Sequence, residues 1–346
     1  MWRDPLVALF PAIATLDAGC FVVGGAIRDL ILGRTPDDVD VACPDPFAIA
    51  TRLGRKVIRL GDQEHLSAYR VVVDDHVYDF AAILDGDIGR DLERRDFTVN
   101  AMAIDLASNT LLDPHGGRRD LEARVVRMVK ASNFDDDPLR LLKGVRMAVK
   151  YGFTLEPATL DSIRTRAARI VDVAAERILF ELSVIFSSNR LRSAIALLRE
   201  TGLDRPLGLT LRDVAADDVP LAAAYALLVD DPRRYAERWR WSEGLLREVL
   251  ALRALMEQHD RVALYDAGEV VARQLPAMLR ALGRDETLDF PDFTIRALLT
   301  GTEIAALTGV APGPELGAIK RALLERQIRG EIVSKEHAIA EFTRRS

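Results

Sequence analysis

The sequence predicts a mixed α/β head followed by an all-α remainder. Up to about residue 132, short apolar runs typical of β-strands alternate with helical segments and glycine turns. From residue 133 onward the apolar residues recur with a helical period, and no convincing strand follows. The 346 residues also exceed the usual roughly 100–200 residues of one domain. We therefore expect a catalytic head over residues 1–132, a helical neck over 133–190, and a helical body and tail over 191–346.

Within the head, each predicted element follows from apolar spacing and from the turn residues around it. We expect helices over residues 1–18, 26–32, 46–53 and 118–124, and strands over 21–23, 38–43, 57–60, 68–73, 76–83 and 125–129. Residues 85–92 read as a short polar link, and residues 112–117 as a tight turn. We expect these strands to form one mixed sheet with helices packed on one side.

Composition excludes several classes of protein. The sequence has no run of 18 apolar residues and no basic-then-apolar start, so it predicts neither a membrane span nor a secretory signal. Cys20 and Cys43 lack metal-ligand spacing and read as reduced core residues, which predicts a cytoplasmic protein. The net charge of −6 argues against a general nucleic-acid coat. Residues 118–169 nevertheless hold twelve Lys/Arg against seven Asp/Glu, which leaves RNA binding open.

Two carboxylates mark the first candidate site. Asp38 and Asp40 lie two residues apart in a predicted strand, so their side chains should point to the same face. Such a pair requires a counter-charge, and Mg²⁺ prefers carboxylate oxygens together with phosphate. The alternative is a solvated strand face. Asp79 lies in another apolar strand, where it is either a third acidic ligand or a half-buried edge residue.

A glycine turn lies just upstream of these carboxylates. Gly24 and Gly25 stand where a helix begins, and glycine there lets a phosphate approach backbone N–H groups closely. Arg28, one turn into that helix, can add positive charge. The alternative for the glycine pair is an ordinary turn. Together with Asp38 and Asp40, these residues indicate a nucleoside triphosphate that is attacked at phosphorus.

The combined pattern, GGAIRDLILGRTPDDVD, resembles the signature of the class II nucleotidyltransferases. That family comprises bacterial tRNA CCA-adding enzymes, their CC-adding and A-adding relatives, and bacterial poly(A) polymerases. RRDFTVNA at 94–101 resembles its second motif, DDPLR at 136–140 its base-reading motif, and ERILFEL at 176–182 its fifth motif. Residues 301–328 resemble the tail of tRNA nucleotidyltransferases, with a basic helix that could hold the RNA backbone.

The resemblance implies a polymerase β-like head with two Mg²⁺ ions, CTP and ATP as substrates, and the tRNA 3′ end as partner. It assigns both ions to Asp38 and Asp40, with Asp79 as a further catalytic carboxylate. It assigns the nucleotide to a larger set of residues: Gly24, Gly25, Arg28, Arg95, Asp96, Asn100, Asp137, Arg140, Lys143 and Arg146. The Glu–Arg pair of the fifth motif reads as a stabilising element of the neck.

Within that set, Asp137 and Arg140 would read the base. A carboxylate that accepts and a guanidinium that donates complement the amine and ring nitrogen of cytosine or adenine, while uracil and guanine place a carbonyl where the amine should be. The alternative for Asp137 is a helix N-cap before Pro138. Lys143 stands where the family usually has Arg, which removes the planar fork at that position.

We therefore expect a template-independent nucleotidyltransferase that adds C, A or both to tRNA. The rival interpretations are a poly(A) polymerase, a catalytically silent RNA-binding protein and a small-molecule nucleotidyltransferase. In CCA-adding members a mobile loop before the RRDFT motif is implicated in the switch from C to A. Only about ten residues separate Ile83 from Arg94 here, which favours a CC-adding enzyme. The sequence does not determine the oligomeric state.

Overall fold

The computed structural model describes residues 2–16, 18–54, 56–60 and 68–343 of the chain. The chain divides into two compact units, Met1–Ile185 with Ala196–Leu207, and Phe186–Ile195 with Gly208–Ser346. The predicted boundary after residue 190 falls close to this division, whereas the predicted boundary after residue 132 lies inside the first unit. The expected head and neck are therefore parts of one compact unit.

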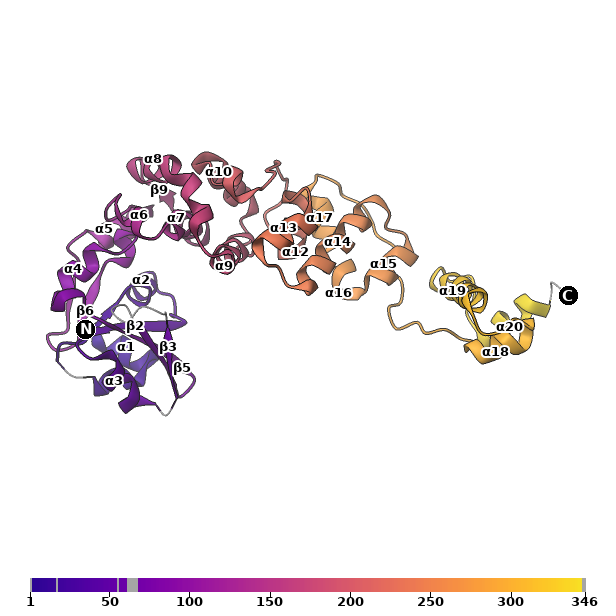
Figure 1. The fold of residues 1–346 in the computed structure, drawn as a ribbon, viewed down its shortest axis with the longest axis horizontal. Helices are drawn as coiled ribbons and strands as arrows, with labels where there is room; N and C mark the ends of the chain where they lie inside the picture. Colours follow the sequence, from indigo (N-terminus) through magenta and orange to yellow (C-terminus); the bar gives the residue numbers. More distant parts are fainter. Residues whose placement is uncertain (1, 17, 55, 61–67, 344–346) are drawn as a thin grey trace. The chain divides into compact units, whose positions relative to one another are not determined.

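The head is built on a mixed sheet, as predicted. Among the described residues this sheet has seven strands in the order β3-β4-β5-β2-β1-β6-β7 (Figure 1). Only β2 and β5 run parallel, and the other neighbouring strands are antiparallel. The strands are β1 Phe21–Val23, β2 Asp38–Cys43, β3 Val57–Leu60, β4 Ala68–Val73, β5 His76–Ala82, β6 Ala103–Asp105 and β7 Thr110–Leu112.

One face of this sheet is apolar and covered. Val39 and Val41 of β2 are at most 1% exposed, and Tyr78 and Phe80 of β5 are fully buried beside them. The helices α1 (Arg3–Leu9), η1 (Pro11–Thr15) and α3 (Pro46–Leu53) belong to this side of the head, and the backbone N–H of Ala12 donates to the Tyr78 hydroxyl. Because side chains alternate along a strand, Asp38 and Asp40 are left on the other face.

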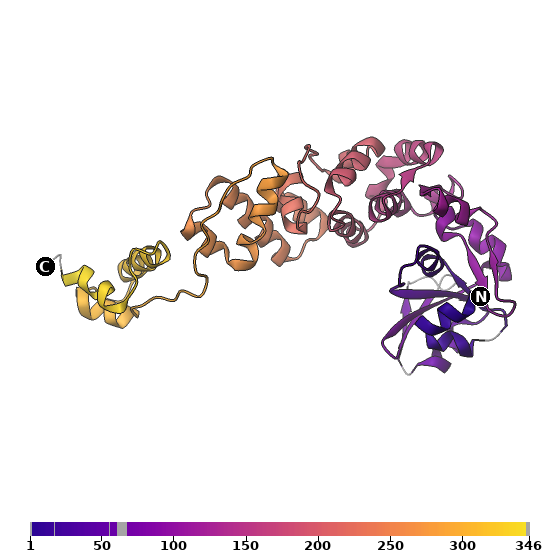
Figure 2. The same cartoon turned by 180° about the vertical axis from the view of Figure 1, so that it is seen from behind.

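Two predictions for the head were wrong. The single helix expected over residues 1–18 is two short helices, because Phe10 adopts an extended φ of −133° before Pro11. The helices also do not all lie on one side of the sheet. α2 (Gly25–Ile31) lies on the opposite side from α1 and α3 in both views (Figures 1 and 2), and it brings the glycine turn to the face that carries the carboxylates.

The rest of the first unit is mainly helical. The expected polar link is in fact η3 (Leu84–Gly86) and α4 (Ile88–Glu93), and the Asp87 side chain caps α4 by accepting from Gly89 and Arg90. The further elements are η4 Thr98–Asn100, α5 Gly117–Glu122, β8 Val125–Val126, α6 Asn133–Asp136, α7 Leu139–Tyr151, β9 Thr154–Leu155, α8 Pro157–Arg166, η5 Ala167–Asp172, α9 Ala175–Phe186 and α11 Asp204–Leu207. The helix α10 (Leu191–Thr201) is divided between the two units at residue 195.

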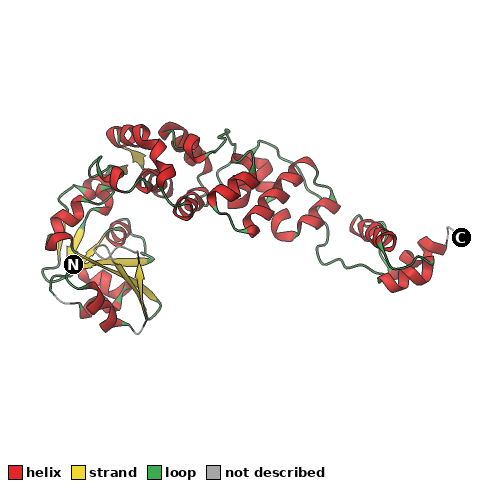
Figure 3. Cartoon of the chain, viewed as in Figure 1, coloured by secondary structure: helices red, strands yellow, loops and turns green. Residues whose placement is uncertain are grey.

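One short strand appears where none was expected. Gly152 ends α7 in a left-handed conformation and turns the chain back, so that β9 pairs in parallel with β8. The strand predicted over residues 125–129 is correspondingly shorter, and beyond β8 only an isolated bridge joins Met128 to Phe97. Figure 3 shows that the described strands are confined to the first unit.

The second unit contains the helices α12 Leu221–Leu228, α13 Pro232–Trp239, α14 Glu243–Glu257, α15 Arg261–Ala267, α16 Glu269–Ala272 and α17 Leu275–Ala281. Trp239 and Trp241 are 3% and 8% exposed, and the Trp241 ring lies 4.6 Å from that of Tyr225. Their burial places these aromatic rings in the core of the unit, so they do not form an exposed stacking surface for RNA. No described helix of the chain is long and apolar enough to cross a membrane.

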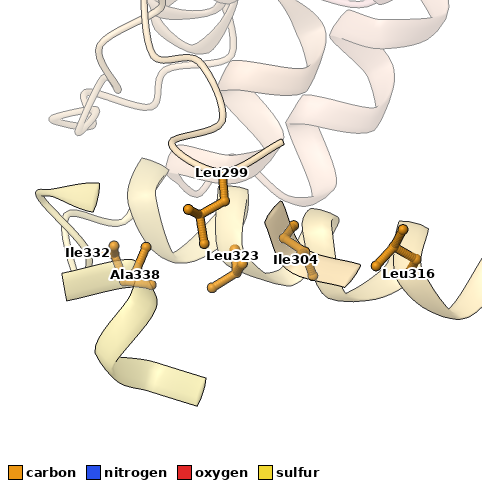
Figure 4. Packing of buried hydrophobic residues seen from close by; sticks show 6 residues of the cluster. All are labelled: Leu299, Ile304, Leu316, Leu323, Ile332 and Ala338. Atoms are coloured by element: carbon orange, nitrogen blue, oxygen red, sulfur yellow. The ribbon is translucent and has the colours of Figure 1, made fainter. Parts of the chain in front are cut away.

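A small separate core holds the C-terminal helices α18 (Gly301–Thr308), α19 (Pro314–Ile328) and α20 (Lys335–Thr343) together. Figure 4 shows the buried side chains of this cluster, which are Leu299, Ile304, Leu316, Leu323, Ile332 and Ala338. Thr300 and Glu303 form a capping box that fixes the start of α18.

Candidate active site

Three neighbouring strands bring acidic and basic side chains into one row. Asp40 of β2 is the register partner of Asp79 of β5, and Asp79 is the register partner of Arg70 of β4. Paired residues on adjacent strands point to the same face of a sheet. Asp38, two residues before Asp40, shares that face. The predicted pair Asp38 and Asp40 therefore lies beside Asp79, for which the sequence left two roles open, and also beside Arg70, which the sequence analysis did not include.

Arg70 binds Asp79 with two hydrogen bonds. Its Nε donates to Asp79 Oδ1 over 2.8 Å, and its Nη2 donates to Asp79 Oδ2 over 2.6 Å. The same Nη2 lies 3.8 Å from Asp38 Oδ2. A register signal could have revealed this contact: Asp74 and Asp75 form a two-residue turn with positive φ, which pairs Val73 with His76 and hence Arg70 with Asp79.

The glycine turn packs directly against this row. Gly24 has a φ of +75°, a left-handed value that strains any other residue. A Cβ there would lie 3.0 Å from Arg95 Nη1 and 3.3 Å from Asp40 Oδ2. α2 begins at the next residue, Gly25. The sequence feature Gly24-Gly25 therefore places a helix start, the Asp40 carboxylate and the Arg95 guanidinium together.

Burial and mutual repulsion disfavour the charged carboxylates. Burial, followed by the charge of Asp79, raises the pKa of Asp38. Burial raises the pKa of Asp40 to about 6, with further raising by Asp38 and Asp79, although Arg95 acts in the opposite direction. A cation placed here would relieve this cost. No cluster of three metal-ligating side chains is found among the described residues. The predicted ligands Asp38 and Asp40 offer carboxylate oxygens, which suit Mg²⁺ when phosphate and water complete its shell.

Arg28 is engaged within the protein rather than left open toward the turn. Its Nε and Nη2 donate to the two oxygens of Asp29, and its Nη1 donates to Asn100 Oδ1 over 2.7 Å. Its guanidinium also lies 4.6 Å from the centre of the Tyr151 ring. Burial on its own would lower the pKa of Arg28, but Asp29 outweighs it and the pKa is raised. The predicted contact with phosphate remains untested.

The RRDFT segment forms a hydrogen-bonded chain with Arg28. Asn100 Nδ2 donates to Asp96 Oδ1 over 3.0 Å, and the Phe97 backbone N–H donates to the same oxygen. Burial would raise the pKa of Asp96, but the charge of Lys143 and the Asn100 hydrogen bond prevail and lower it. Asp96 is thus a partly buried, ionised link between α2 and α7.

The residues predicted to read the base lie at the start of α7, and each already has protein partners. Asp137 accepts from the Leu139 N–H over 3.2 Å and from Arg177 Nη2 over 3.0 Å. Arg140 Nη1 donates to the backbone oxygens of Arg94 and Asn133 over 2.7 and 3.1 Å. The capping contact expected as the alternative role of Asp137 is therefore present, and the base-reading role remains a prediction.

The basic side chains of α7 that were predicted to bind the nucleotide, Arg140, Lys143 and Arg146, are partly neutralised. Arg146 Nε lies 2.6 Å from an oxygen of Glu181, which is 3% exposed. Burial raises the pKa of Glu181, and Arg146 and Lys143 pull it down. Because Arg177 and Glu181 of α9 both pair with residues at the start of or within α7, the ERILFEL segment holds α9 against α7, in line with its expected stabilising role.

Besides Arg70, the sequence analysis missed Asp91, Asp29 and Tyr151, which hold the arginines of this site in place. Asp91 is 1% exposed and accepts from both arginines of the RRDFT motif. Asp29 accepts from Arg28 and from the Tyr151 hydroxyl over 2.9 Å. The helical spacing of Asp91 before Arg94 and Arg95 was a readable signal, whereas the contact between Asp29 and Tyr151 spans 122 positions and gave none.

The basic tail helix is less available than its sequence suggested. Arg321 pairs with Asp266 and Glu325, Arg326 with Glu331 and Glu341, and Arg329 with Glu325. Lys320 is exposed. Binding of the RNA backbone by these arginines would therefore require them to give up ion pairs inside the second unit.

Comparison with known proteins gives two family models that match this chain. Residues 20–85 and 67–127 match the Poly A polymerase head domain. Residues 152–208 match a model described as the probable RNA and SrmB-binding site of polymerase A. The matched residues include the glycine turn, both strand carboxylates and the RRDFT segment.

Curated relatives extend the comparison. The CC-adding tRNA nucleotidyltransferase of Synechocystis sp. is 40% identical over 185 residues, which are 51% of this chain and 44% of that protein. The CCA-adding enzyme of Geobacillus stearothermophilus is 31% identical over 352 residues, which are 93% of this chain and 83% of that enzyme. The crystal structure of the Bacillus stearothermophilus CCA-adding enzyme in complex with CTP has the same fold, with a TM-score of 0.80 and 23% identity, covering 99% of this chain and 97% of that one.

The raised pKa of Asp40 predicts that removing its charge stabilises the metal-free protein. A carboxyl whose pKa rises from 3.8 to about 6 on folding costs nothing at low pH, and its cost is complete above about pH 6. Asp40→Asn should therefore increase the free energy of unfolding at pH 8 by up to about 3 kcal/mol, and by roughly half of that at pH 5. Chemical denaturation in the presence of a chelator measures both values.

Asp161→Asn is the matched control, because Asp161 is an exposed carboxylate on α8 in the same unit. It should change stability by less than about 0.5 kcal/mol at either pH. An Asp40→Asn protein that is less stable than its parent at pH 8 would mean that attraction to Arg95 outweighs burial.

Proposed function

Because this chain belongs to the class II tRNA nucleotidyltransferase family, we propose that it transfers nucleotidyl groups from CTP or ATP to the 3′ end of tRNA and releases pyrophosphate. The observation that carries this proposal is the placement of Asp38 and Asp40 on one strand face, directly beside the Gly24 turn and Arg95. Phosphoryl chemistry requires negative ligands for metal and positive or N–H groups for phosphate within one small volume.

Asp38 and Asp40 would hold two Mg²⁺ ions. Their shared strand face and their raised pKa values support this assignment. Bound there, Mg²⁺ would lower the pKa of the tRNA 3′ hydroxyl and take up charge on the triphosphate. The half-exposed Asp38, with 54% of its side chain accessible, is the more open of the two carboxylates to an incoming nucleotide.

The phosphates would lie against the glycine turn. A Cβ at Gly24 would crowd Arg95 and Asp40, so glycine keeps the turn close to these side chains. The buried Arg95 Nε has no hydrogen-bond partner among the described residues. Arg95 Nη2 donates to Asp91, and this contact orients the guanidinium so that Nη1 lies beside the turn. Arg28 and Asp96 fix Asn100 between them, so we assign these three residues to holding the sugar and the turn in place.

The base would be read at the start of α7. Asp137 and Arg140 offer a carboxylate and a guanidinium on successive turns, and Lys143 adds charge toward Asp96. The pair complements the amine and ring acceptor that cytosine and adenine share. Their existing partners Arg177, Arg94 and Asn133 hold the two side chains in place before a nucleotide arrives, which reduces the ordering cost of recognition.

The test of the reaction uses tRNA that lacks its CCA end, with each nucleoside triphosphate supplied separately. We expect incorporation of C, and Asp38→Asn and Asp40→Asn should each retain less than about a hundredth of the parent rate, because the metal site is lost. Product length on a denaturing gel also separates the rivals. A long A tail would indicate a poly(A) polymerase, and no extension by the folded parent would indicate a silent RNA-binding protein.

Asp137→Asn tests base reading while preserving the helix cap. The amide oxygen can still accept from the Leu139 N–H, but the carboxylate needed for the base amine is gone. We expect the preference for C over U to fall by about tenfold, which corresponds to one lost polar pairing. Asp161→Asn is the control, since Asp161 is an exposed carboxylate on α8, and it should leave the preference unchanged. Unchanged selectivity in Asp137→Asn would leave this residue a structural cap.

The link before the RRDFT motif supports addition of C only. Residues 84–93 are η3 and α4, capped by Asp87, with Gly86 and Gly89 as their glycines. A short segment that is already helical cannot move far, so it is poorly suited to act as the mobile loop that would change the base preference of the pocket. We therefore propose that this protein adds CC and that another enzyme supplies the terminal A.

Supplying tRNA that ends in CC together with ATP alone tests this assignment. We expect at least about a hundredfold slower addition of A than of C to the shorter tRNA, because the pocket has no means to exchange its preference. A control tRNA that ends before both C residues, with CTP, confirms that the same preparation is active. Efficient addition of a single A would instead establish the complete CCA-adding activity.

A further inference from the structure

We propose that Arg70 is a positioning residue: it occupies Asp79 and thereby restricts the divalent-metal site to Asp38 and Asp40. This inference rests on the proposed function, since it concerns the same metal site. It goes beyond that function because it assigns a role to a side chain on β4 that makes no contact with the glycine turn or the base-reading helix. It also explains why three neighbouring carboxylates provide only two metal ligands.

Both carboxylate oxygens of Asp79 are engaged by the Arg70 guanidinium. Both of its oxygens accept from Arg70, over 2.8 and 2.6 Å, in the two-pronged arrangement that matches guanidinium to carboxylate. Asp79 is only 13% exposed, whereas Arg70 is 39% exposed and Asp38 54%. The contact is held by strand register, because β4 and β5 place Arg70 directly opposite Asp79. Asp79 is thus removed from the metal site by an ion pair built into the sheet.

Arg70 also acts on the carboxylates that remain. Its Nη2 lies 3.8 Å from Asp38 Oδ2 while it holds Asp79. The Arg70–Asp79 pair therefore adds almost no net charge to the row. Without Arg70, a third negative charge would face Asp40 across the β2–β5 pairing.

This arrangement sets how strongly the protein holds a divalent cation before a nucleotide binds. Three free carboxylates would form a tight site by themselves, while two carboxylates beside an arginine hold Mg²⁺ weakly. The triphosphate brings its own oxygens, so metal and nucleotide would bind together. Arg70 thus couples metal binding to the presence of substrate.

The experiment measures the Mg²⁺ dissociation constant by calorimetry, without nucleotide and at a fixed pH of 8. Arg70→Gln should tighten Mg²⁺ binding roughly three- to tenfold, because it frees Asp79 and removes a nearby positive charge. Arg70→Lys keeps the charge and should stay within about twofold of the parent. Arg59→Gln is the matched control: Arg59 is on β3 and pairs with Tyr69, which neighbours Arg70 and so points to the other face, and its affinity should not change.

The double variant Arg70→Gln/Asp79→Asn distinguishes the proposal from its main rival. It removes both members of a neutral pair, so we expect an affinity within about twofold of the parent. If Asp79 were itself a metal ligand, the double variant would bind Mg²⁺ more than about tenfold more weakly, and the proposal would be overturned. Unchanged or weaker binding in Arg70→Gln would overturn it as well.

Circular dichroism verifies that each variant folds. Should Arg70→Gln fail to fold because Asp79 is left unpaired, the double variant, in which no charge is left unpaired, still decides between the two roles of Asp79. The metal titration requires no catalytic turnover. A protein that transfers no nucleotide would therefore refute the proposed function while leaving the outcome for Arg70 readable.

Discussion

Repulsion among carboxylates on one face of the sheet is the constraint on which the first unit depends. Asp38, Asp40 and Asp79 lie side by side, and burial makes their charges more costly still. The protein meets this cost with arginines from two separate segments. Arg70 comes from a neighbouring strand, and Arg95 approaches from the segment after α4. The negative charge that these arginines do not neutralise lies at Asp38 and Asp40, where a cation would bind.

Hydrogen bonds and opposite charges also join the sheet to the helices that follow it. Arg28 contacts Asn100, and Asn100 contacts Asp96, whose ionised form is favoured by the charge of Lys143 on α7. Tyr151, at the end of α7, donates to Asp29 beside Arg28. These buried polar links are satisfied only when sheet, turn and helix are correctly placed. They give a physical reason why the head and the neck form one compact unit.

The sequence predicted what depends on local periodicity. The helix at 46–53 has the expected bounds, and the shared face of Asp38 and Asp40 follows from strand alternation alone. What it did not predict depends on contacts between distant segments. The sequence placed Asp137 and Arg140, the proposed base-reading pair, at the start of a helix, but it did not predict the partners that hold them. The break at Pro11 shows the converse, because a local rule that disfavours helix before proline was readable and was overlooked.

The ion pairs of α19 carry a consequence for the ionic behaviour of this protein. Each phosphate that a free cation neutralises releases bound counterions, and steepens the salt dependence of RNA affinity by roughly 0.7–0.9 in logarithmic slope. Arg321 and Arg326 are already neutralised by carboxylates of the second unit. An RNA strand that lies along α19 would exchange one set of ion pairs for another and release few counterions. The number of basic residues in α19 therefore overestimates how strongly its affinity for RNA depends on salt concentration.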